Sequence, residues 1–139
     1  MKKELQQKQI ITYLPYKVEA VARNDVFPVE IEGIDLHTNE VIIERVSTPI
    51  KDIKLILKPL TDLWKDENEE DRDELSELEI YHLEGTLVCA QVGLMPIDGT
   101  LVRNINHEAV ISLVKKHYDI YNLLKTGGAV TIEELRQLL

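Results

Sequence analysis

The chain has very little cysteine, since Cys89 is the single one among its 139 residues. One cysteine excludes an internal disulfide, and chains without disulfides are typical of reducing compartments. The sequence also lacks a run of about 18 apolar residues, the length that a membrane-spanning helix needs. Residues 1–4 are charged and no apolar stretch follows them, so no signal peptide is expected. These absences predict a soluble, cytoplasmic protein that does not enter a membrane.

Motifs that carry catalytic chemistry are also missing. The sequence has no phosphate-binding glycine loop, no strained serine turn and no dinucleotide-binding fingerprint. Its four histidines lack the close partner spacing of a structural zinc site. His82 lies near Cys89 in the sequence, but a buried, inert thiol is the simpler interpretation of that cysteine. We therefore expect no catalytic residue, no cofactor and no bound metal, and thus a protein that is not an enzyme.

Acidic charge is abundant, but it is confined to one segment. Residues 66–84 hold ten acidic side chains and a single basic one, Arg72. This segment therefore accounts for the whole net charge of −9, and the rest of the chain is neutral. Because nucleic-acid sites need a surplus of basic residues, direct nucleic-acid binding is disfavoured. Residues 65–79 are expected to form an exposed acidic segment.

Part of the acidic segment resembles a calcium-binding loop. Asp66, Asn68 and Glu70 fit the first, third and fifth positions of such a loop, and Glu77 fits the last. The sixth position, which needs glycine for a sharp turn, is Asp71. Without that glycine, and without a flanking pair of apolar helices, a solvated acidic helix or loop is expected instead.

The N-terminal half shows the two-residue period of β-strands. After a short helix expected at residues 4–12, alternating apolar residues predict strands at 17–22, 29–36, 40–46 and 53–58. Residues 47–49, Ser-Thr-Pro, are expected to break the third strand. The connections are too short for parallel crossovers, so the strands should pair antiparallel. The expected structure is a small antiparallel sheet or partial barrel over about residues 17–58.

The C-terminal half shows a helical period. Its apolar residues recur at three- and four-residue steps, and they are Val110, Ile111, Val114, Tyr118, Tyr121 and Leu124. They predict a helix over residues 107–125 that covers the sheet, with Gly127 and Gly128 as a helix stop rather than a phosphate site. Thr131 and Glu134 fit a capping box for a last helix at 132–139. Residues 86–92 favour a strand over a helix, which the same residues also allow. The fold class is therefore α+β, with a sheet packed against C-terminal helices in a single domain of residues 1–139.

Three segments together are similar to a known group of proteins. They are residues 13–16 (YLPY), 57–63 (LKPLTDL) and 117–124 (HYDIYNLL), the last running on to Gly127. In this order and spacing they resemble small uncharacterised phage and prophage proteins of Bacteroidetes, over about residues 10–135. The acidic run and residues 85–103 depart from that pattern. The resemblance implies a mobile-element protein that works inside a bacterial cell, and it implies no catalytic residues.

These observations favour a non-enzymatic protein-binding or adaptor module whose partner is another phage or host protein. The candidate partner-binding residues combine one aromatic anchor with acids of the charged segment: Trp64, Glu69, Glu70, Asp71, Asp73 and Glu74. Because no apolar residue lies between Trp64 and Leu75, these acids are expected to be dispensable for folding. The alternative is an acidic decoy that imitates the charge of nucleic acid and occupies a basic protein.

Overall fold

The computed structural model describes residues 5–23, 25–77, 80–83, 86–89, 93–96 and 107–138. The chain forms two compact units. The first combines the residues up to Lys58 with those from Leu123 onward, and the second comprises residues 59–122. Each unit mixes helices with strands, so the expected α+β class is confirmed. The expectation of a single domain over residues 1–139 stays a prediction.

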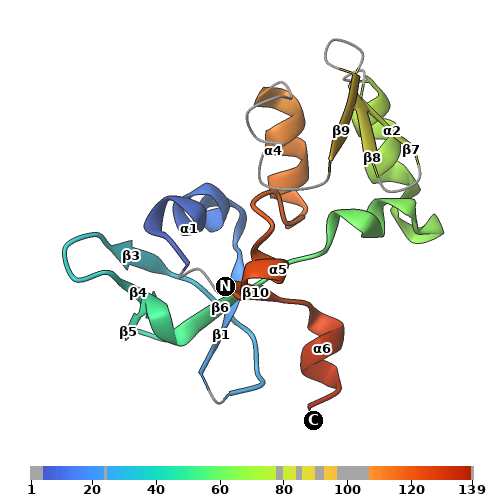
Figure 1. The fold of residues 1–139 in the computed structure, drawn as a ribbon. Coiled ribbons are helices and arrows are strands. Elements are labelled where there is room, and N and C mark those ends of the chain that lie inside the picture. Colours follow the sequence, from blue (N-terminus) through green and yellow to red (C-terminus); the bar gives the residue numbers. More distant parts are fainter. Residues whose placement is uncertain are drawn as a thin grey trace. The chain divides into compact units, whose positions relative to one another are not determined.

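A four-stranded sheet forms the centre of the first unit (Figure 1). Its strands are β1 (Glu19–Ala22), β2 (Val29–Glu30), β6 (Ile53–Ile56) and β10 (Ala129–Val130), in the order β10-β6-β1-β2. β1 pairs antiparallel with both β2 and β6, in agreement with the antiparallel pairing that was expected. β10 pairs parallel with β6, and it comes from the far end of the chain. The sheet is therefore completed by a strand outside the predicted range of 17–58, and it does not close into a barrel.

A second sheet of the first unit contains β3 (Gly33–Asp35), β4 (Glu40–Ile43) and β5 (Val46–Pro49), all antiparallel. The expected strand at 29–36 is thus split between two sheets. Glu44 and Arg45 both have positive φ, 49° and 68°, which is the conformation of a two-residue hairpin turn. The expectation that residues 47–49 break the strand is wrong. Pro49 is tolerated at the end of an edge strand because no further strand needs its missing N–H.

Helices of the first unit are short. They are α1 (Gln7–Tyr13), η1 (Leu14–Tyr16), η2 (Ile50–Asp52), α5 (Leu123–Thr126) and α6 (Ile132–Arg136). An N-terminal helix was predicted and is present. The C-terminal helices α5 and α6 belong to the same unit as the sheet, in agreement with the predicted sheet packed against C-terminal helices. The residues of this unit that are wholly or almost wholly buried come from several of its elements: Ile10, Tyr13, Val18, Ala20, Val41, Ile50, Leu55 and Leu57.

Two helix ends follow the sequence signals closely. Gly127 has φ 95°, and both Gly127 and Gly128 donate their N–H groups to the carbonyl of Leu123. These two N–H groups bond to the last turn of α5, so the glycine pair ends the helix, as predicted. Thr131 accepts a hydrogen bond from the Glu134 N–H at 3.1 Å and caps α6. Its hydroxyl also donates to the Glu134 carboxylate at 3.2 Å, a side-chain contact in place of the expected bond to the Thr131 backbone.

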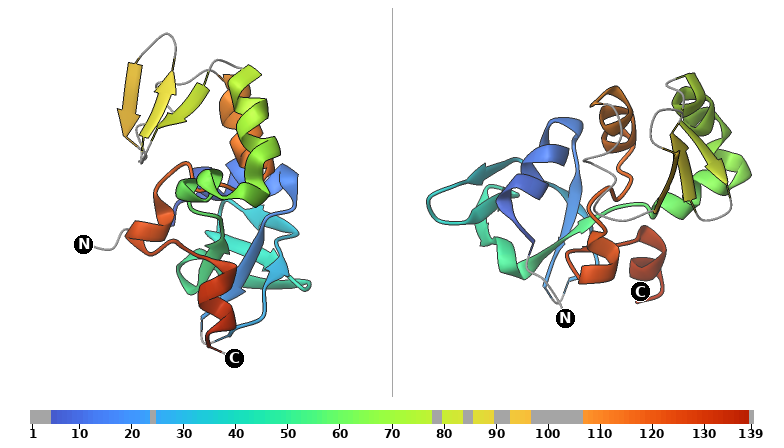
Figure 2. Two further views of the ribbon diagram at one scale, coloured as in Figure 1. Left: turned by 90° about the vertical axis from the view of Figure 1, so that its right-hand side faces the viewer. Right: turned by 45° about the horizontal axis from the view of Figure 1, so that its top comes forward.

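The second unit begins with two 3-10 turns, η3 (Leu60–Trp64) and η4 (Asp66–Asn68), and continues into α2 (Glu69–Glu77). Three antiparallel strands follow in chain order, β7 (Ile80–Leu83), β8 (Thr86–Cys89) and β9 (Gly93–Pro96). The unit also contains α4 (His107–Lys115), which packs against α2 (Figure 2). No helix in the described part of the chain is long and apolar enough to cross a membrane.

The expected helix over residues 107–125 is wrong in its length. α4 ends at Lys115, where His117 adopts a left-handed conformation with φ 63°. The N–H of Tyr118 then bonds to the Leu113 carbonyl and the N–H of His117 to the Val114 carbonyl, which is the usual pattern of a left-handed helix end. A histidine at this place carries no sequence signal for a stop. α4 belongs to the second unit, whereas the sheet that it was expected to cover belongs to the first.

The buried face of α4 differs from the expected stripe. Ala109, Ser112, Leu113 and Val114 are buried, whereas Val110 and Ile111 are only partly covered.

Truncating Val114 to Ala should cost about 1–3 kcal/mol of unfolding free energy, because it removes buried methyl groups and leaves a small void. Lys115 on the same helix is exposed, so Lys115→Ala should cost less than about 0.5 kcal/mol. Urea denaturation of both variants checks this pair, and equal losses would contradict the assigned face.

Candidate protein-binding surface

Residues 69–77 of the acidic segment fold as α2, and polar contacts fix the start of this helix. The guanidinium of Arg72 donates to the carbonyl of Leu63 and, at 2.7 Å, to the carbonyl of Lys65. The side-chain amide of Asn68 donates to the carbonyl of Asp62, also at 2.7 Å. Side chains of α2 and η4 thereby provide hydrogen-bond donors for the carbonyls around the end of η3. These bonds hold α2 in place although almost all of its residues are polar.

One side of α2 is anchored in the second unit. Leu75, the single apolar residue of α2, is buried. The carboxylate of Asp71 accepts a hydrogen bond from the Tyr118 hydroxyl at 2.6 Å. It also forms an ion pair with the Lys116 ammonium at 2.8 Å. Tyr118 is fully buried, and the side chain of Asp71 is only 16% exposed. Asp71 therefore joins α2 to the residues that follow α4.

Lys116 bridges two carboxylates of α2, since its ammonium also pairs with Glu74. Burial lowers the pKa of Lys116, but its hydrogen bonds to Asp71 and Glu74 outweigh burial, so the pKa is raised. The hydrogen bond from Lys116 lowers the pKa of Glu74. Burial, reinforced by the hydrogen bond to Asp71, raises the pKa of Tyr118 far above its usual value. At neutral pH Tyr118 is therefore a protonated phenol, Lys116 an ammonium and Glu74 a carboxylate.

The opposite side of the segment carries exposed carboxylates, which we call the outer acidic face. Its members are Asp66, Glu67, Glu69, Glu70, Asp73 and Glu77. At 3.6 residues per turn, the four members within α2 fall in an arc of about 100°, away from Asp71 and Leu75. None of the six forms an ion pair with another residue in the described ranges. The anchored side thus fixes which carboxylates face solvent.

The structure divides the predicted binding residues into two groups. Glu69, Glu70 and Asp73 lie on the outer acidic face, whereas Asp71 is turned inward and Glu74 shares Lys116 with it. The expectation that all five acids are dispensable for folding stays a prediction, and the contacts of Asp71 argue against it for that residue. That expectation counted only apolar residues, and Asp71 is held by polar contacts. The side chain of Trp64 lies outside the described part of the structure.

Sequence reasoning missed the residues that orient α2. Tyr118 was expected as part of an apolar stripe facing the sheet, and no contact was predicted for Lys116. Their partners lie far away in the sequence, 47 residues for Tyr118 and Asp71 and 42 for Lys116 and Glu74. No short-range pattern indicates contacts of that separation, so the sequence carried no signal for them.

No metal centre is formed by the described residues, where no group of three or more His, Cys, Asp or Glu side chains could hold an ion. Asp66 to Glu77 form η4 and α2, so the loop of a calcium site is not made. The strand register pairs Cys89 with Ile80, two residues before His82. The side chains of Cys89 and His82 lie outside the described part.

Comparison with known proteins gave no matching family model, no matching curated protein and no matching solved structure. The resemblance of residues 13–16, 57–63 and 117–124 to phage and prophage proteins stays a prediction.

Asp71 and Asp73 are a matched pair, because they have the same side chain two positions apart on α2. Asp71→Ala should lower the free energy of unfolding by about 1–3 kcal/mol, since it leaves the buried Tyr118 hydroxyl and Lys116 without their shared acceptor. Asp73→Ala should be neutral or slightly stabilising, because alanine favours the helix and no contact is lost. Chemical denaturation measures both, and the anchored side is misassigned if the two variants unfold alike.

Proposed function

We propose that this chain is a non-enzymatic protein-binding module, in which the outer acidic face binds a basic surface of another protein. One observation carries the proposal, namely the sorting of carboxylates around α2. Asp71 and Glu74 share the ammonium of Lys116, whereas the outer carboxylates have no ion pair with a cation among the described residues. The uncompensated charge is thus gathered on one side of an anchored helix.

Like charges so close together repel one another, and a partner that brings Lys or Arg side chains relieves that repulsion. A fixed acidic patch also attracts a basic partner at long range and speeds its association. The anchoring by Arg72, Asp71 and Leu75 matters here, because a helix held in place loses less conformational freedom on binding. The same physics predicts that binding weakens as salt concentration rises.

The decoy hypothesis is a special case of this proposal, in which the basic partner is itself a nucleic-acid-binding protein. It stays a prediction, as does the phage or host origin of the partner. Competition separates the two cases. A decoy must be displaced from its partner by DNA or RNA, whereas an adaptor binds a site that nucleic acid leaves open.

The test compares two triple variants with equal changes in charge. Glu69→Gln, Glu70→Gln and Asp73→Asn neutralise the outer acidic face. Glu19→Gln, Glu30→Gln and Glu133→Gln neutralise three exposed acids of the first unit. Each variant and the parent chain are immobilised for capture from bacterial lysate, and captured proteins are then purified and titrated by calorimetry.

We expect a basic protein to bind the parent and the first-unit variant with similar affinity, and to bind the outer-face variant at least about tenfold more weakly, since three charge contacts of up to about 1 kcal/mol each are lost. Circular dichroism must show that the outer-face variant keeps its fold. The proposal fails if no basic protein is retained in a one-to-one complex, or if both triple variants lose the partner equally.

A further inference from the structure

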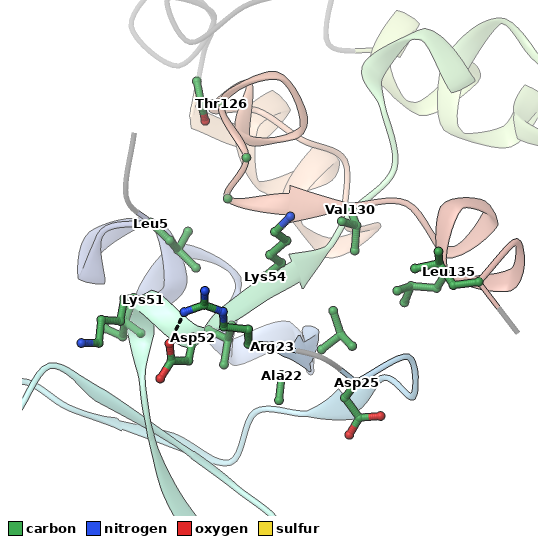
Figure 3. A pocket seen from close by; sticks show the side chains of 16 residues that line it. Leu5, Ala22, Arg23, Asp25, Lys51, Asp52, Lys54, Thr126, Val130 and Leu135 are labelled. Atoms are coloured by element: carbon green, nitrogen blue, oxygen red, sulfur yellow. Dashed lines mark ion pairs between the residues drawn. The ribbon is translucent and has the colours of Figure 1, made fainter. Parts of the chain in front are cut away.

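The first unit contains an open cleft of about 450 Å³, within the size range of small-ligand sites. It lies beside the four-stranded sheet, and its walls come from β1, β6, β10, η2, α6 and the end of α5 (Figure 3). All these elements belong to one compact unit, so the cleft does not depend on how the two units are arranged.

Much of the cleft surface is apolar. Val21, Ile50, Ile53, Val130 and Leu135 contribute aliphatic side chains. All five are buried or partly buried, so they offer a preformed wall rather than loose surface residues. A ligand that fills this space must therefore have an aliphatic body, whose removal from water would favour binding.

The acidic residues of the cleft are already engaged within the protein. The carboxylate of Asp25 accepts hydrogen bonds from the backbone N–H groups of Val26 and Phe27, at 2.7 and 3.2 Å. The carboxylate of Asp52 faces the guanidinium of Arg23, with Nη1 and Oδ1 3.9 Å apart. Both negative charges thus have donors or a counter-charge close by.

The basic residues of the cleft make fewer contacts within the protein. Lys54 rises from β6 into the ring of lining residues, and its ammonium has no ion pair or hydrogen bond with any residue that the structure describes (Figure 3). Arg23 faces Asp52 through Nη1 alone and keeps its side chain 76% exposed, so other N–H groups of its guanidinium can still reach a ligand. The charge that remains available to a ligand in the cleft is therefore positive.

From the apolar wall and the available cations together, we infer that this cleft binds a small organic carboxylate with an aliphatic chain. The carboxylate faces Lys54 and Arg23, and the chain lies along Val21, Val130 and Leu135. This site is separate from the outer acidic face, and it prefers the opposite charge. It does not rest on the proposed function, because no residue of the cleft belongs to α2.

The test uses octanoate as the probe, with octylammonium and acetate for comparison, in an NMR titration of the backbone amides at physiological salt. Octanoate should shift amides lining the cleft in a saturable manner. Acetate should not, because it lacks the aliphatic body, and octylammonium should bind several-fold more weakly, because its charge is repelled. Lys54→Met should weaken octanoate binding roughly twofold to fivefold, the range for exposed charge pairs.

Lys8→Met is the matched control, because Lys8 is exposed on α1 and does not line the cleft. Its octanoate affinity should equal that of the parent. Arg23→Gln is the second cleft variant, and it should weaken octanoate as Lys54→Met does. Three results would overturn the inference: no saturable shift at the cleft amides, equal affinity for octylammonium, or equal weakening by Lys8→Met and Lys54→Met.

Discussion

The contact of Asp71 with Tyr118 and Lys116 is the interaction on which the second unit depends. α2 has one buried apolar side chain, Leu75, so apolar burial alone supplies little of its stability. A buried phenol that donates to the Asp71 carboxylate, together with an ammonium that pairs with it, adds to the bonds made by Arg72 and Asn68. Burying the Tyr118 hydroxyl without this acceptor would be costly, so the contact also fixes how α2 is rotated about its axis.

That rotation decides what the protein shows to solvent. Once Asp71 and Leu75 face inward, helical geometry turns Glu69, Glu70 and Asp73 outward. A strongly acidic segment thereby becomes an ordered surface. The first unit has the opposite preference, because its cleft keeps Lys54 and Arg23 available while its carboxylates are engaged. The two surfaces lie on different units, so their ligands can be studied independently.

Local signals in the sequence predicted the elements whose cause is local. The alternation around β1, β4 and β6, the cap at Thr131 and the stop at Gly127 were all found, because each depends on residues within a few positions. The end of α4 was missed because His117 adopts the left-handed conformation without a glycine. β10 was missed because it has only two residues, too few to show an alternating pattern, and because its partner β6 lies far away in the sequence.

The candidate surface was predicted only in part for the same reason. The charge run located the acidic segment, but charge alone does not distinguish Asp71 from Asp73. The distinction comes from Tyr118, 47 residues away from Asp71, and from the packing of α4 against α2. Periodicity placed Tyr118 in a core correctly, yet it gave no indication that its hydroxyl needs an acceptor on α2.

A double-mutant cycle between Asp71→Ala and Tyr118→Phe tests the central claim most directly. Tyr118→Phe removes the hydroxyl and leaves the buried ring, so the cycle isolates the hydrogen bond from the packing. Denaturation of the parent, the two single variants and the double variant gives the coupling free energy. The contact described here predicts about 1–2 kcal/mol of coupling, within the range for residues that share a hydrogen bond. A coupling near zero would contradict it, since the two side chains would then contribute to stability independently.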